Sequence, residues 1–112
     1  MDKLIIKGGS KISGSVNVHG SKNSALPIIV SSLLSEKTLK LSNVPNVVDV
    51  LNLIKLLKNY GVKIEHKKNK LKINPSKIKN LSADYDVVRK MRASILILGP
   101  LLSRFGEARI SL

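Results

Sequence analysis

The sequence predicts a small α/β domain in which apolar helices fill the interior and sheets with one solvent-exposed face wrap around them. Several short segments alternate apolar and polar residues, which is typical of strands with one wet face. Two longer segments carry no charge and therefore offer no well-solvated helical face. An ordinary doubly wound sheet has the opposite polarity, with continuous apolar strands and amphipathic helices. Periodicity alone leaves a plain α+β sandwich open.

Six segments are predicted as strands, and five of them alternate regularly: Ser15–His19, Thr38–Ser42, Val62–His66, Lys70–Ile73 and Ala108–Leu112, with Lys3–Lys7 as a less regular sixth. The short connection Lys67-Lys68-Asn69 predicts an antiparallel hairpin between two of them. The last alternation is still running at Leu112, so the chain is expected to be a fragment of a longer protein, with a strand edge left uncovered.

The two charge-free segments, Asn23–Leu34 and Ala93–Ser103, are predicted as helices, and both are expected to be buried. Ser21 can cap the first of them. Pro27 is tolerated only near the opening turn of that helix, because a proline deeper in a helix removes a hydrogen bond. Pro100 is expected to kink the second helix.

An ordinary amphipathic helix is predicted between them, over Val47–Tyr60, with polar residues such as Asp49 and Lys55 along one side. Asn46 can cap the start of this helix, and Gly61 can close its end.

The composition excludes several classes of protein. The chain has 112 residues, room for one domain, and no cysteine, so it offers neither a disulfide nor a thiolate zinc site. His19 and His66 are too few and too far apart to indicate a metal site. The longest uncharged stretch, Asn23–Ser35, has 13 residues, fewer than the roughly 20 that cross a bilayer. No membrane association and a cytoplasmic location are therefore expected.

The net charge of +13, from 20 basic and 7 acidic residues, raises the alternative of a nucleic-acid-binding module. Most of the basic residues are lysines, and the abundance of Lys, Ile and Asn is typical of an AT-rich coding sequence. Aromatic residues make up only 3%, so the stacking surfaces of single-strand binders are missing. Nucleic-acid binding is the minor alternative.

Gly20-Ser21-Lys22-Asn23 lies where an alternating strand gives way to a charge-free helix. The N-terminus of a helix presents unpaired N–H groups and a partial positive charge, so a lysine beside it favours a phosphate or carboxylate ligand. Asn23 can hydrogen-bond a substrate hydroxyl or carboxylate. The alternative is that Ser21 merely caps the helix and Lys22 is solvated.

A second candidate is Arg92, the last charge before the other apolar stretch, with Arg89 three residues earlier on the same helical face. A guanidinium in that place either reaches back to water or binds an anion bidentately. The alternative is a basic rim that balances Asp84 and Asp86.

Several separated motifs resemble, in order, the N-terminal part of the UDP-N-acetylglucosamine 1-carboxyvinyltransferase family of enolpyruvyl transferases: Gly20-Ser21-Lys22-Asn23-Ser24-Ala25-Leu26-Pro27, Asn43-Val44-Pro45, Tyr85-Asp86, Met91-Arg92-Ala93-Ser94-Ile95, Gly99-Pro100-Leu101 and Arg104-Phe105-Gly106. The shikimate-pathway sister enzyme, enolpyruvyl-shikimate-phosphate synthase, shares the fold and the lysine, but its motif is typically Ser-Lys-Ser. It is the second choice.

The resemblance implies an inside-out α/β barrel of two domains, of which only the first part is present here. Residues 1–21 would pack with the missing C-terminal domain, and residues 22–112 would begin the N-terminal substrate-binding domain. It implies transfer of the enolpyruvyl group of phosphoenolpyruvate to the 3-hydroxyl of UDP-N-acetylglucosamine. Lys22 and Asn23 match the positions that contact phosphoenolpyruvate, and Arg92 matches one that contacts the UDP-sugar.

The resemblance implies no cofactor, and the rest of the same polypeptide as the only protein partner. The loop and the aspartate that act as catalytic residues in this family would lie beyond Leu112, so the isolated chain is expected to be inactive. An accessory protein that lacks the catalytic half by design is a further alternative.

Overall fold

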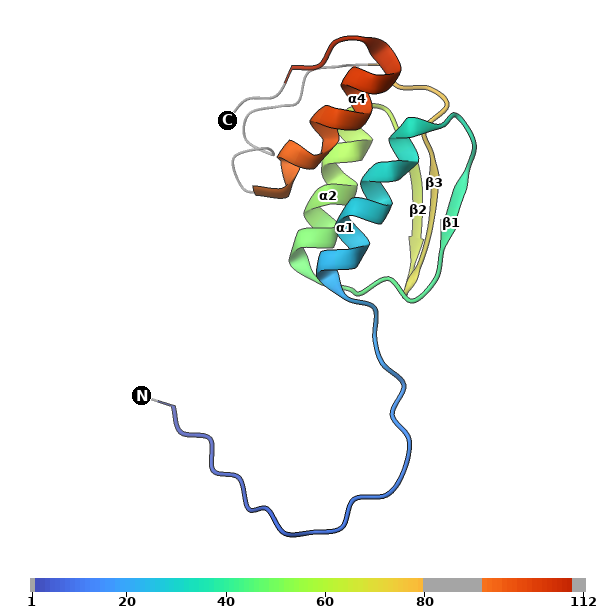
Figure 1. Cartoon of the computed structure of the whole chain (residues 1–112). Helices are drawn as coiled ribbons and strands as arrows, with labels where there is room; N and C mark the ends of the chain where they lie inside the picture. The colour runs from blue at the N-terminus through green and yellow to red at the C-terminus, as the bar shows by residue number, and fades with distance from the viewer. Residues whose placement is uncertain (1, 80–91, 110–112) are drawn as a thin grey trace.

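The computed structural model describes residues 2–79 and 92–109, with only the backbone described at 92–94 (Figure 1). Two helices lie side by side on one face of a three-stranded sheet, and a third helical segment packs across one end of them. The elements are α1 (Lys22–Ser31), η1 (Ser32–Leu34), β1 (Leu39–Leu41), α2 (Val48–Asn59), β2 (Lys63–Lys67), β3 (Lys70–Asn74), η2 (Arg92–Ile97) and α4 (Leu98–Phe105).

The sheet has the strand order β1-β3-β2, and both of its pairings are antiparallel. The hairpin predicted around Lys67-Lys68-Asn69 is confirmed, with Ile64 opposite Ile73 in β2 and β3. Side chains alternate along β3, where Leu71 and Ile73 are buried while Lys70 and Lys72 are exposed. The prediction of strands with one wet face is therefore confirmed for this sheet.

The core lies between the sheet and the helices. Its fully buried residues come from every layer and include Ile29 of α1, Leu53 and Leu57 of α2, Ile73 of β3 and Leu101 of α4. Tyr60, directly after α2, is also fully buried, and its hydroxyl has no hydrogen-bond partner among the described residues. Burial raises the pKa of Tyr60 from 10.0 to about 12, because the phenolate would lose its hydration.

The charge-free helices are less buried than the sequence predicted. α1 buries Ala25, Leu26, Ile29 and Val30, but Ile28 on its other side is 46% exposed. In the second charge-free segment Ile97 and Leu101 are buried, whereas Ile95 is 46% exposed and Leu102 is 44% exposed. The physical reason is that one three-stranded sheet covers one side of a helical layer, so the opposite side of each helix stays open to solvent.

The predicted caps are partly wrong. Ser21 occupies the N-cap of α1, but its side chain makes no capping hydrogen bond, and the N-cap of α2 is Val47 rather than Asn46. The end of α2 is as predicted: Gly61 has φ 92 and donates to the Lys58 carbonyl at 2.9 Å, while Val62 donates to the Leu57 carbonyl at 3.1 Å. This pair of bonds is the Schellman motif, which needs a residue in the left-handed region.

The prolines also differ from the sequence prediction. Pro27 is the sixth residue of α1, beyond the opening turn, and the helix continues through it. Because proline has no N–H, the Asn23 carbonyl does not accept the hydrogen bond that residue 27 would otherwise donate to it. Pro100 lies in the first turn of α4, just after the change from the 3₁₀ geometry of η2 to α-helix, so the break in the segment precedes the proline.

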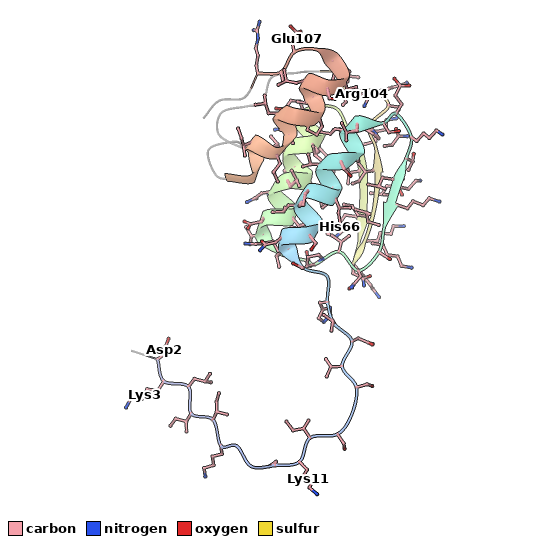
Figure 2. All side chains as sticks on the ribbon, in the orientation of Figure 1. Asp2, Lys3, Lys11, His66, Arg104 and Glu107 are labelled. Carbon is pink, nitrogen blue, oxygen red and sulfur yellow. The ribbon has the colours of Figure 1, made fainter. Side chains whose placement is uncertain are left out.

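Arg104 of α4 joins three parts of the fold. Its Nη1 atom donates to the carbonyl oxygens of Leu33 at 3.1 Å, Ser35 at 3.2 Å and Pro75 at 3.1 Å. Its side chain, labelled in Figure 2, is 13% exposed, and its Nη2 atom lies 3.5 Å from the Oε1 atom of Glu36. Arg104 thus holds the end of η1, the end of the sheet and α4 together, with its planar donors directed at carbonyl groups.

Residues 2–20 have no regular secondary structure and form an extended arm that runs away from the rest of the chain, apart from hydrogen bonds of Val18 and Gly20 to Asn43 (Figure 1). The strands predicted at Lys3–Lys7 and Ser15–His19 are therefore not formed, because no second strand lies beside the arm in the described part of the chain. The arm raises the radius of gyration to 17.6 Å, compared with roughly 13 Å for a compact chain of this length. Of the strand predicted at Ala108–Leu112, only Arg109 forms a bridge, and residues 110–112 lie outside the described residues.

Candidate functional site

The predicted lysine lies where two helices begin. Lys22 is the first residue of α1, and the N-termini of α1 and α2 lie at the same end of the molecule (Figure 1). The Lys22 Nζ atom is 2.9 Å from the Oδ2 atom of Asp49, which stands in the first turn of α2. The side chains of Lys22 and Asp49 are 49% and 42% exposed, so the ion pair lies at the surface and within reach of a solute.

The first turn of α1 keeps its backbone donors available. Ala25 donates to the Ser21 carbonyl at 2.9 Å, as the first bond of the helix. Among the described residues no side chain caps the N–H groups before it, and the turn contains no acidic residue. Asn23, the second residue of α1, is exposed in this turn. The end of α1 therefore offers free N–H groups, a lysine and an amide to an anion.

Asn43 fixes the backbone that leads into this turn. Its Nδ2 donates to the Val18 carbonyl at 3.2 Å, and its Oδ1 accepts from the Gly20 N–H at 3.1 Å. Asn43 has φ 56, in the left-handed region that asparagine tolerates better than most residues. A Cβ atom at Gly20 would overlap the Asn43 carbonyl oxygen, so only glycine fits there. The approach to Lys22 is thus set by a side chain more than twenty positions away.

A shallow cleft of about 150 Å³ lies beside this junction, lined mainly by backbone and small side chains: Gly20, Ser21, Ser24, Ala25, Ile28, Leu41, Ser42, Asn43, Val44 and Pro45. A larger hollow of about 410 Å³ lies on the sheet, where Lys40, Lys67, Lys70 and Lys72 surround Glu65. The larger hollow does not include Lys22 or Asn23. The sheet lysines are the wet face of the hairpin, as the sequence predicted, and the candidate site is the end of α1.

Of the three predicted site residues, Lys22 and Asn23 are neighbours in the sequence and stand together in the first turn of α1. Arg92 begins η2, but its side chain lies outside the described residues, as do Arg89, Asp84 and Asp86. Sequence reasoning missed Asp49, because an acid in the first turn of a helix is common and gives no sign of a distant partner. It noted Asn43 only as part of a motif, although an asparagine before Val-Pro is a reasonable signal for a left-handed turn.

Neither a membrane span nor a metal cluster is found in the part of the chain that the structure describes. None of its helices is long and apolar enough to cross a bilayer. No group of three His, Cys, Asp or Glu side chains gathers in residues 2–79 and 95–109.

The fold of the chain resembles one quarter of a solved enolpyruvyl transferase. The solved structure of the enolpyruvyl transferase NikO from Streptomyces tendae matches 94% of this chain and 25% of its own, with a TM-score of 0.79 and 23% sequence identity. Because the match leaves out only 6% of this chain, most of the extended arm falls inside it.

The chain belongs to the EPSP synthase (3-phosphoshikimate 1-carboxyvinyltransferase) family, whose model matches residues 6–112. Curated relatives include the UDP-N-acetylglucosamine 1-carboxyvinyltransferases of Campylobacter hominis and Sulfurovum sp. (strain NBC37-1), each 53% identical over the whole chain. The protein of the same name from Geotalea uraniireducens is 50% identical. The chain spans about a quarter of the length of these relatives, 26% to 27%.

Proposed function

We propose that this chain is the N-terminal part of an enzyme that transfers the enolpyruvyl group of phosphoenolpyruvate to the 3-hydroxyl of UDP-N-acetylglucosamine, with release of phosphate. This is the first committed step of peptidoglycan synthesis, and its substrates belong to the cytoplasm. The observation that carries the proposal is the identity of 50% to 53% over the whole chain with relatives of this one name. The alternative acceptor, 3-phosphoshikimate, appears in the name of the family model.

In this proposal Lys22 and Asn23 bind phosphoenolpyruvate at the first turn of α1. The substrate carries a phosphate and a carboxylate, and the site offers the Lys22 ammonium, the Asn23 amide and unpaired backbone N–H groups. Charge-assisted hydrogen bonds of this kind are about twice as strong as neutral ones. They also stabilise negative charge that develops during addition and elimination at the enolpyruvyl carbon.

Arg92 is proposed to contact the UDP-sugar, with its guanidinium suited to bidentate binding of a diphosphate. General acid and base groups, which proton transfer to and from the reacting atoms requires, are assigned to the part of the enzyme beyond Leu112. We therefore expect no turnover from the 112-residue chain alone.

The architecture proposed for the whole enzyme is the inside-out α/β barrel, with residues 1–21 packed on the C-terminal domain. Support comes from the arm, whose large apolar side chains are 80% to 97% exposed in this structure: Leu4, Ile5, Ile6, Ile12, Val16 and Val18. Burying such side chains stabilises a fold by roughly 1.5–3 kcal/mol each, so their exposure calls for a covering surface. The half-exposed apolar sides of α1 and α4 have the same need.

The test is made with the protein encoded by the complete reading frame, by measuring phosphate release with UDP-N-acetylglucosamine and with 3-phosphoshikimate as acceptor. Turnover with the first and not the second supports the proposal, and the reverse result would replace it with the shikimate-pathway reaction.

The role of Lys22 is tested by Lys22→Ala, which should lower kcat/KM for phosphoenolpyruvate about 100-fold or more, because a bound anion would lose its charged partner. Lys55→Ala is the matched control, since Lys55 is an exposed lysine of α2 and should leave kcat/KM within about twofold. Near-normal turnover of Lys22→Ala would remove Lys22 from the site.

A further inference from the structure

Lys22 stands at a position where the helix itself disfavours a lysine. The N-terminus of a helix carries a partial positive charge, so acidic residues are the favourable ones there. The first turn of α1 has no acid, and Lys22 is its first residue. The negative charge that compensates Lys22 comes instead from Asp49 on α2, whose carboxylate lies 2.9 Å from the ammonium.

Asp49 is itself well anchored. It lies in the first turn of α2, where the helix favours a carboxylate, and the next residue, Val50, is fully buried in the core. The backbone before Lys22 is fixed on the other side by the hydrogen bonds of Asn43 to Val18 and Gly20. The distance between the Asp49 carboxylate and the Lys22 backbone is therefore fixed.

The ion pair contributes little to the stability of the fold. Both side chains are close to half exposed, and exposed ion pairs change the folding equilibrium by no more than about fivefold. The fold does not depend on this pair, because Leu26 and Ile29 of α1 share one buried core with Val50 and Leu53 of α2.

We propose that Asp49 is a positioning residue for Lys22, holding its ammonium at the paired N-termini of α1 and α2, where an anionic substrate binds. The proposal rests on the function proposed above and adds a residue to that site. Asp49 acts through Lys22 and does not itself bind the substrate.

Two opposing effects decide what removal of the carboxylate does. When the substrate has to order a lysine side chain that is otherwise free, its affinity falls about 15-fold or more. Without the carboxylate, the substrate no longer has to compete with Asp49 for the lysine, which raises its affinity at most about fivefold. The first effect is larger, so loss of the Asp49 charge should weaken substrate binding overall.

The experiment compares Asp49→Asn with Glu65→Gln in the protein encoded by the complete reading frame. The control is matched, since Glu65 also pairs with a lysine, Lys72, at 3.3 Å and also becomes an amide of the same shape, but it lies on the outer face of the sheet. For Asp49→Asn we expect the KM for phosphoenolpyruvate to rise about threefold or more, with kcat within about twofold, because the cost of ordering the Lys22 side chain is met when the substrate binds and is the same in the ground and transition states. Glu65→Gln should change neither.

A double-mutant cycle shows whether Asp49 acts through Lys22. In a Lys22→Gln background, Asp49→Asn should have no further effect on the dissociation constant of phosphoenolpyruvate, measured by calorimetry. Asp49→Glu, which keeps the charge, should recover most of the affinity. The proposal would be overturned if Asp49→Asn left KM unchanged or lowered it, or if it lowered kcat alone. It would also be overturned if Asp49→Asn weakened binding equally with Lys22 present and in the Lys22→Gln background.

Failure of the proposed function can be told apart from failure of this inference. In ¹⁵N-lysine NMR spectra without substrate, the Lys22 ammonium signal should show slowed proton exchange in the unsubstituted protein and lose it in Asp49→Asn. A protein that shows this difference but no enolpyruvyl transfer would refute the function and keep the pairing. A protein with full transferase activity and no difference in the spectra would refute the positioning role.

Discussion

Replacement of Arg104 should cost more stability than any other single change on the surface of α4. The Nη1 atom of Arg104 lies within 3.2 Å of three carbonyl oxygens, but it carries two hydrogens, so two strong bonds is the limit at any moment. The Leu33 and Pro75 carbonyls are partly buried and cannot be fully hydrated after the change, whereas Ser35 is exposed. Two charge-assisted bonds of about 1.5 kcal/mol each predict a loss of about 3 kcal/mol for Arg104→Ala.

The neighbours of Arg104 add little to this value. Glu36 is 79% exposed and 3.5 Å away, so Glu36→Gln should change the free energy of unfolding by less than about 0.5 kcal/mol. The Phe105 ring lies 4.9 Å from the guanidinium carbon, and Phe105→Leu should lose about 0.5 kcal/mol of cation–π energy. Arg104→Lys keeps the charge but not the planar donor group, and its loss should lie between those of Glu36→Gln and Arg104→Ala.

The assay is urea unfolding followed by circular dichroism, with the free energy of unfolding extrapolated to water for all four variants. A loss under about 1 kcal/mol in Arg104→Ala would mean that water replaces the guanidinium at these carbonyls without cost. A loss in Glu36→Gln equal to that in Arg104→Ala would mean that the ion pair, and not the carbonyl contacts, stabilises this corner of the fold.

Two further predictions concern single buried or crowded positions. Burial raises the pKa of Tyr60 to about 12, while the unfolded chain ionises near 10, so the contribution of Tyr60 to stability should be constant below pH 10 and fall between pH 10 and 12. Tyr60→Phe should therefore lose less stability than the unsubstituted protein between pH 7 and pH 11, as unfolding curves at these two pH values would show. At pH 7 its stability should be unchanged or about 1 kcal/mol higher, because the substitution removes a hydroxyl without a partner in the described structure. Gly20→Ala should destabilise the protein by about 2 kcal/mol, because its Cβ would meet the Asn43 carbonyl oxygen. Gly99→Ala has no atom within 4 Å of the added Cβ, so it should be neutral or stabilising by up to about 1 kcal/mol in the same assay. Equal effects of the two substitutions would contradict the close approach of Gly20 to Asn43.

Local patterns predicted most of the elements between residues 22 and 79. The hairpin follows from alternation on both sides of Lys67-Lys68-Asn69, and the end of α2 follows from Gly61 after a periodic helix. In both cases the information lies within a few residues of the structure that it determines, so sequence reasoning can reach it.

The arm before α1 shows where local patterns fail. Val16 and Val18 alternate with polar residues as a strand should, but a strand exists only when a second strand pairs with it. The described part of the chain provides none, so the same pattern gives an exposed, extended segment. The burial of both charge-free helices was overestimated for the same reason, because periodicity shows which residues need covering and not what covers them.

Residues that break a local rule gather at one end of the fold. Lys22 stands at the positive end of a helix, and Pro27 interrupts the hydrogen bonds of the same helix. Asn43 adopts a left-handed conformation, and Gly20 lies too close to the Asn43 backbone for any side chain. Each of these features lowers stability or removes a bond, and none improves the core. Natural sequences keep such conflicts where function requires them. Their convergence around the N-terminal half of α1, rather than the charge of the lysine alone, supports the proposal of anion binding at this end of the molecule and not on the lysine-rich face of the sheet.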